Sequence, residues 1–125
     1  MSGSIDIRFF RVAVLYAILG MALGIYMAAS RDFSLRPAHA HWLLLGWVSM
    51  FLYGVFYKLF AAAQGALAAW HWWLANIGLI VMVAGIVMIY SGMPERGDTL
   101  AKIGALINIA GMGLFAYNVF RGTRA

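Results

Sequence analysis

The chain has 125 residues, of which 65% are hydrophobic and only 10% are charged. Soluble domains are about 45–50% apolar and about 25% charged, so this composition excludes an ordinary soluble protein and indicates one embedded in lipid. The absence of cysteine excludes disulfides, thiolate metal sites and covalent attachment of c-type haem. The net charge of +5 does not indicate nucleic-acid binding, because the basic residues stand singly at the ends of apolar runs.

Long apolar segments follow one another along the chain. Each supplies the roughly 20 residues that a helix needs to cross the hydrocarbon core of a bilayer. Backbone groups in lipid must be satisfied inside their own segment, so these runs are expected to be helices. The sequence predicts an all-α, integral-membrane four-helix bundle in one domain (1–125), with helices at approximately 6–29, 37–63, 67–91 and 99–120.

The connections between these helices carry turn and cap signals. Pro37 fits the first turn of the second helix, where its missing N–H costs nothing. Gly65 marks a tight connection between the second and third helices. Asp98 or Thr99 is expected to be the N-cap of the fourth helix, because short polar side chains accept the unpaired N–H groups there.

The basic residues predict the orientation by a small margin. Cytoplasmic ends carry more Lys and Arg, and their long side chains reach toward the headgroups of the lipid bilayer. We expect a bacterial inner-membrane protein with both termini cytoplasmic. The cytoplasmic side then holds Arg8, Arg11, Lys58, Arg121 and Arg124, and the other side holds Arg31, Arg36, Arg96 and Lys102.

Two histidines, His39 and His41, stand in "RPAHAHWLLLGWVSM" at the start of an apolar run. Two positions along an α-helix correspond to about 200° of rotation, so the rings cannot bind one metal or haem from the same face. Imidazole is a common metal ligand, and an ionisable residue at membrane depth is a candidate functional residue. The alternative is that both rings are interfacial and bind loop carbonyls or headgroups.

The residues below each histidine suggest what its face contacts. Gly46, about two turns below His39, offers a gap against which a flat macrocycle fits, and Met50 lies below it on the same face. The face of this helix that carries His41 is suited to the apolar edge of a porphyrin. The His39 face continues with Tyr53 and Tyr57, and the His41 face carries Leu45, Val48, Leu52 and Phe56.

The third histidine, His71, begins the third helix at the opposite membrane face. It therefore cannot share a ligand with His39 or His41 within one subunit. We expect an interfacial side chain among tryptophans, with a role at a quinone edge or in a proton path as the alternative.

Other polar residues and glycines lie within the predicted helices. Asn76 and Asn108 are expected to form hydrogen bonds between helices. Lys58 is expected to be an interfacial anchor, with a proton path through Tyr57 and Tyr53 as the alternative. Small residues spaced for close helix contact are Gly20 and Gly24 on the first helix, and Gly104, Gly111 and Gly113 on the fourth.

Two stretches carry a family resemblance that covers roughly residues 36–90. "HAHWLLLGWVSMFLYGVFYKLF" resembles the helix with an H-x-H pair in the catalytic subunit of haem–copper oxidases and nitric oxide reductases. "AAWHWWLANIGLIVMVAG" is similar to the helix after it. The resemblance implies that His39 binds a high-spin haem and His41 a low-spin haem. That family's subunit has twelve helices, and its copper ligands and the other low-spin ligand lie on helices absent here, so a complete haem–copper centre is not expected.

The twelve helices of that family form three arcs of four, so a homotrimer of this chain would resemble the complete arrangement. The sequence then predicts a b-type cytochrome with haem b between subunits, held by His39 and His41, that transfers electrons with quinol or respiratory-chain components as partners. One alternative is a haem-based sensor or carrier of nitric oxide or oxygen with a single histidine ligand. Another is a haem-free protein, either a copper binder using some of the eight methionines or an assembly or interaction partner of respiratory complexes.

Overall fold

The computed structural model describes residues 3–124, and this part of the chain contains four helical segments long and apolar enough to cross a membrane. This confirms the prediction of an all-α protein with four candidate spans. The first, third and fourth spans are α1 (Ile5–Ser30), α4 (Ala66–Ile89) and α5 (Pro94–Gly122). The second span combines α2 (Arg36–His41), a π-helical segment (Trp42–Val48) and α3 (Ser49–Leu59).

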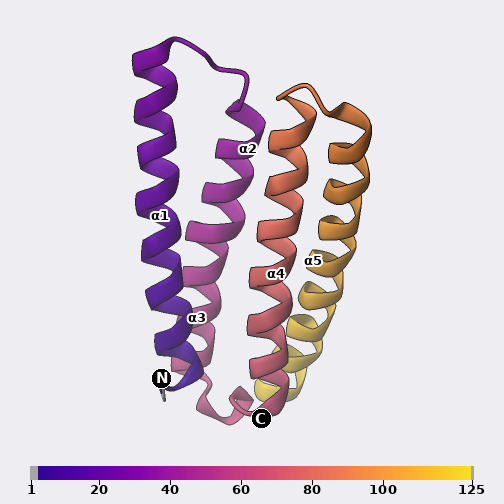
Figure 1. Cartoon of the computed structure of the whole chain (residues 1–125). Helices are drawn as coiled ribbons and strands as arrows, with labels where there is room; N and C mark the ends of the chain where they lie inside the picture. The colour runs from indigo at the N-terminus through magenta and orange to yellow at the C-terminus, as the bar shows by residue number, and fades with distance from the viewer. Residues whose placement is uncertain (1–2, 125) are drawn as a thin grey trace.

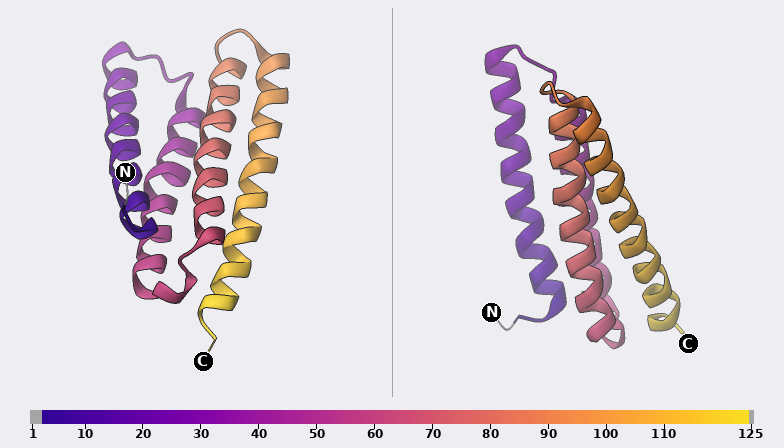
Figure 2. Two further views of the ribbon diagram at one scale, coloured as in Figure 1. Left: turned by 60° about the horizontal axis from the view of Figure 1, so that its bottom comes forward. Right: turned by 45° about the vertical axis from the view of Figure 1, so that its right-hand side comes forward.

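The helices lie side by side in chain order, with α1 at one edge and α5 at the other (Figure 1). The two ends of the chain lie at the same end of the molecule, and the other views show the same arrangement (Figure 2). The second span packs against α1, and α4 packs most extensively against α5. The edge helices therefore keep broad apolar outer faces, with Ile25 on α1 and Phe120 on α5 72% and 75% exposed.

Two helix boundaries differ from the prediction. The second span ends at Leu59, because Phe60 leaves the helical conformation and Ala61–Ala63 form a short 3-10 turn. The fourth span begins at Pro94, where a proline N–H is not needed, so it starts about one turn earlier than expected. The predicted cap at Asp98 or Thr99 is therefore wrong. Both residues lie inside α5, where Asp98 forms a 2.8 Å ion pair with Lys102 and Thr99 donates to the carbonyl of Glu95.

The π-helical segment was not expected from the sequence, which predicts a regular α-helix there. A π-helical turn holds more residues than an α-helical turn, because its hydrogen bonds run from i to i+5. Gly46 and Met50 on this span are buried, and Trp42 is half-buried against the core. The Trp42 indole N–H donates to the Tyr16 carbonyl at 3.0 Å, which fixes this segment against α1. Such segments occur frequently at functional sites.

A row of small residues holds α4 and α5 together. Seven-residue spacing keeps side chains on one seam of two nearly parallel or antiparallel helices. A Cβ at Gly85 would lie 2.7 Å from the Gly97 carbonyl oxygen, so neither position has room for a side chain. In lipid, such close approach of backbones is a main source of helix association. The buried glycines of this seam are Gly78, Gly85, Gly97, Gly104 and Gly111.

Gly104 and Gly111 thus pack as predicted, whereas a Cβ at Gly113 would meet nothing within 4 Å. The same seven-residue spacing continues toward the end of the molecule that holds the chain termini. It reaches His71 on α4 and Asn118 on α5, and both side chains are fully buried. The seam therefore changes from glycine to polar side chains at that end.

Candidate functional site

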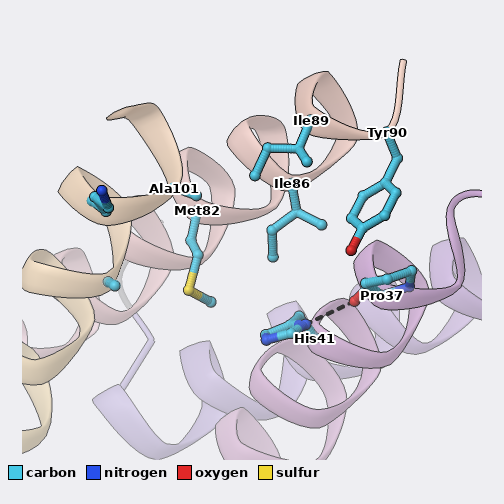
Figure 3. Close-up of a pocket in the computed structure, with 9 residues that line it drawn as sticks. Pro37, His41, Met82, Ile86, Ile89, Tyr90 and Ala101 are labelled. Atoms are coloured by element: carbon cyan, nitrogen blue, oxygen red, sulfur yellow. Dashed lines mark hydrogen bonds between the residues drawn. The ribbon is translucent and has the colours of Figure 1, made fainter. Parts of the chain in front are cut away.

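The rings of His39 and His41 contact different neighbours of α2, as their spacing predicts. His39 lies against α1, where a Cβ on Gly24 would be 3.0 Å from its Cε1 atom. His41 lies in a groove formed by α2, α4 and α5 (Figure 3). The two rings therefore do not converge on a common ligand within this chain.

His41 is held by the first turn of its own helix. Its Nδ1 atom lies 2.7 Å from the carbonyl oxygen of Pro37, and Figure 3 marks this hydrogen bond. A carbonyl only accepts, so Nδ1–H is the donor and the neutral ring keeps the lone pair of its Nε2 atom. Metal-bound histidines commonly have this arrangement, because a backbone carbonyl on one nitrogen orients the other toward the metal. The exposed His41 ring is thus prepared to bind a ligand through Nε2.

The groove beside His41 is apolar and open on one side, with a volume of about 360 Å³. Met82 and Ile86 extend from α4 toward α2, and Tyr90 lies near Pro37 (Figure 3). Lys102 at its margin carries a positive charge and pairs with Asp98. The remaining lining side chains are Ile89, Ala101 and Ala105. The groove can therefore cover one side of a flat apolar group and offers one cation to an acidic substituent.

His39 is half-buried and differs from His41 in its surroundings. Its Nδ1 atom is enclosed by the protein and has no hydrogen-bond partner within residues 3–124. Gly24 makes this position possible, because a side chain there would press on the ring. With Nδ1 enclosed, a group from outside the chain has to bind His39 through Nε2.

Gly46 and Met50 lie inside the molecule and do not border an open gap. A Cβ at Gly46 would be 3.0 Å from the Cβ of Tyr16 and 3.1 Å from a methyl carbon of Leu79. Met50 is 1% exposed. The expectation of space for a macrocycle at Gly46 is therefore wrong, because side chains of α1 and α4 fill that space.

His71 is fully buried, so the expectation of an interfacial side chain is wrong. Its ring centre lies 5.2 Å from that of Phe9 on α1, 4.4 Å from Tyr53 on α3 and 4.8 Å from Phe115 on α5. Residues of every spanning segment thus meet around one imidazole of α4. The neighbouring Trp70 points outward and is 64% exposed, which explains why the local sequence suggests a membrane interface.

A hydrogen-bond network links His71 to the C-terminal end of α5. The Tyr57 hydroxyl lies 3.0 Å from Nδ1 of His71, and the Asn118 amide donates to the same hydroxyl at 3.2 Å. Arg121 donates to the Asn118 side-chain oxygen at 2.6 Å. Because Tyr57 accepts from Asn118, its own proton is available for His71. The second ring nitrogen, Nε2, is buried and has no partner in the described part of the chain.

Asn118 was missed by sequence reasoning, although a signal for it exists. It follows Gly97, Gly104 and Gly111 at seven-residue intervals, which places it on the buried seam. A polar residue on such a seam needs partners, and Asn118 also donates to the Ala63 carbonyl at 3.0 Å.

The predicted interhelical bond of Asn76 is confirmed. The Tyr16 hydroxyl of α1 donates to its side-chain oxygen, and its amide donates to the Trp72 carbonyl at 2.8 Å. Asn108 approaches Met82 of α4, with its amide nitrogen 3.8 Å from the sulfur.

Lys58 is exposed near the end of the second span. The Tyr57 hydroxyl bonds to His71 and Asn118, and no hydrogen bond joins it to Lys58 among the described residues. The role of an interfacial anchor fits this position. Between residues 3 and 124, no three His, Asp or Glu side chains gather closely enough to hold a metal ion.

Length, composition and helix arrangement define an all-α integral-membrane protein. The chain belongs to the DUF2871 family, described as proteins of unknown function, whose family model matches residues 7–119. The match includes His39, His41 and His71 together with most of the length of each candidate span. No curated protein matches the chain.

Proposed function

We propose that this protein is a membrane b-type cytochrome that binds haem b between subunits through His39 and His41 and transfers electrons. The observation that carries the proposal is the hydrogen bonding of His41 together with the groove in which its ring lies. Its Nδ1–H group is bound to the Pro37 carbonyl, and the ring stands in an open, apolar groove. Haem iron is commonly held by a histidine nitrogen in this way.

The residues of the groove fit the chemistry of haem. Ile86, Ile89 and Ala101 offer aliphatic surface to a macrocycle, and Lys102 offers a cation to a propionate. A bound haem supplies a one-electron couple, and two histidine ligands leave no open iron position, which favours electron transfer over gas chemistry. Quinol or a respiratory-chain component is then the expected electron partner.

The placement of the two histidines supports an oligomer. One chain directs His39 toward α1 and His41 toward α4 and α5, so it presents its two rings to different haems. The groove is open, and a neighbouring copy could cover its other side. The exposed outer faces of α1 and α5 provide apolar surface for such a neighbour. A homotrimer would arrange twelve helices as the resemblance to haem–copper oxidases implies.

The reduced-minus-oxidised visible spectrum of the purified protein tests the proposal. The protein is produced with haem supplementation and purified in mild detergent, and the wild type is expected to give the α and β bands of a low-spin b-type haem. His39→Ala and His41→Ala should each abolish them. His71→Gln removes the remaining histidine and should keep the bands, provided that circular dichroism and gel filtration match the wild type.

Other outcomes would contradict the proposal in distinct ways. A haem-free wild type containing copper by elemental analysis would support the copper alternative instead. A high-spin spectrum that shifts with carbon monoxide and depends on one histidine would indicate a five-coordinate sensor or carrier. Native mass spectrometry gives the number of chains and haems in the assembly, and a monomer with a six-coordinate haem would exclude binding between subunits.

A further inference from the structure

A second hollow of about 360 Å³ lies between α1 and α4. The N-terminal parts of these two helices, which line it, lie at the end of the molecule that holds the chain termini (Figure 1). Its lining consists of two arginines, one tryptophan and two aliphatic residues. It does not share a lining residue with the groove beside His41. The proposed haem site therefore does not explain it.

The lining residues of α1 follow a fixed order. Arg8, Arg11, Val12 and Leu15 are spaced so that they lie on one face of a helix. The arginines stand nearest the start of the spanning helix, and the two aliphatic residues lie deeper along it. The hollow is thus positively charged near the membrane surface and apolar toward the membrane interior.

Two of the lining side chains, Arg8 and Trp72, carry hydrogen-bond donors. The guanidinium carbon of Arg8 lies 4.2 Å from the centre of the Trp72 ring, so stacking holds this cation in place. No carboxylate pairs with Arg8 among residues 3–124. The indole Nε1 atom of Trp72 is buried and lacks an acceptor within the same part of the chain. A buried donor without an acceptor is costly, so a ligand that supplies one is stabilised.

We propose that this hollow binds the phosphate group of an anionic phospholipid, with an acyl chain along Val12 and Leu15. Arginine suits phosphate because its planar fork gives several parallel N–H donors. The hollow is apolar toward the membrane interior and lies at the start of a spanning helix. Both features favour a lipid over a free phosphate ion as its ligand. Lys58 in the last turn of α3, Arg121 in the last turn of α5 and Arg124 just after α5 add to its attraction for an anionic membrane surface.

Native mass spectrometry of the complete protein in detergent, titrated with phosphatidylglycerol or phosphatidylcholine, tests this site. We expect one tightly bound phosphatidylglycerol per chain and weaker binding of phosphatidylcholine. The double variant Arg8→Gln/Arg11→Gln should bind phosphatidylglycerol about 30-fold more weakly, since each arginine near an anionic headgroup contributes about a factor of five. The control Lys58→Gln/Arg124→Gln removes the same charge from the same end, and its affinity should change less than about 3-fold.

Trp72→Phe supplies a second test that keeps the ring under Arg8 and removes only the indole N–H. It should weaken phosphatidylglycerol binding by about 5-fold, the usual effect of one hydrogen bond. Equal affinity for the two lipids, or equal losses in the two double variants, would overturn the proposal. Displacement of the lipid by millimolar inorganic phosphate would indicate a soluble phosphate ligand and would also overturn it. None of these measurements depends on haem.

Discussion

The Tyr57 hydroxyl lies 3.0 Å from Nδ1 of His71, and the two residues come from helices at opposite ends of a tight connection. Both side chains are fully buried. Phe9 and Phe115 cover the pair from α1 and α5. This hydrogen bond therefore joins two spans at the place where all the helices meet. Its loss should lower the stability of the whole fold.

Tyr57→Phe should lower the free energy of unfolding by about 1–2 kcal/mol, because it removes the donor to His71 and one acceptor of Asn118. Unfolding by sodium dodecyl sulfate in mixed micelles, followed by circular dichroism, measures the change. Tyr117→Phe is the matched control on the exposed face of α5, where Tyr117 is 57% exposed, and should have an effect below about 0.5 kcal/mol. Equal effects of the two changes would show that the buried bond does not contribute to stability.

The cluster around His71 shows which features of the fold can be predicted from the sequence and which cannot. Each spanning helix is predictable, because length and apolarity decide whether a segment crosses a membrane. The burial of His71 is not predictable from the sequence, because Phe9 and Phe115 enclose it from distant parts of the chain. Its local neighbours, including the exposed Trp70, point to a membrane interface instead.

The histidine pair shows the opposite case. The separation of His39 and His41 depends only on helical rotation, so their different surroundings follow from the sequence. The filling of the space beside Gly46 depends on Tyr16 and Leu79 from other helices, and the π-helical turn that places Gly46 has no periodic signal of its own. Spacing within one helix is therefore predictable, whereas the neighbour that fills a gap is not.

Gly104→Ala should destabilise the protein, because a Cβ there would collide with the backbone of Met82 on α4. We expect a loss of about 1–3 kcal/mol, the usual cost of overpacking. Gly113→Ala changes the same residue type on the same helix where the space is open. It should be neutral or stabilise by up to about 1 kcal/mol, since alanine is the better helix former. Thermal unfolding in detergent compares the two, and a larger loss for Gly113→Ala would contradict the proposed packing.

Gly24→Val should alter the haem site without replacing a proposed iron ligand. A Cβ at this position would lie 3.0 Å from Cε1 of His39, so the imidazole has to move away from α1. Displacing the support of a ligand typically weakens binding by about 10-fold or more. Haem titration by absorbance should show this loss, whereas Ala22→Val on the exposed face of α1 should bind as the wild type does. Unchanged haem affinity in Gly24→Val would argue against His39 as a ligand.

The orientation in the membrane can be tested with single cysteines, because the chain has none of its own. Ser34→Cys lies in the exposed connection after α1, and Thr123→Cys follows α5 at the end of the molecule that holds the termini. The small excess of basic residues at that end predicts that Thr123→Cys reacts with an impermeant maleimide only after lysis of bacterial cells. Ser34→Cys should react in intact cells.

Ser4→Cys serves as the control for this orientation, because Ser4 precedes α1 and is exposed. An even number of spans requires Ser4→Cys and Thr123→Cys to react from the same side. Labelling of these two positions from opposite sides would contradict the arrangement of spans itself. If both positions were labelled in intact cells and Ser34→Cys were protected, the fold would stand and the orientation would be the reverse of the predicted one. The His41 groove, formed near the Pro37 end of α2, would then open near the cytoplasmic surface.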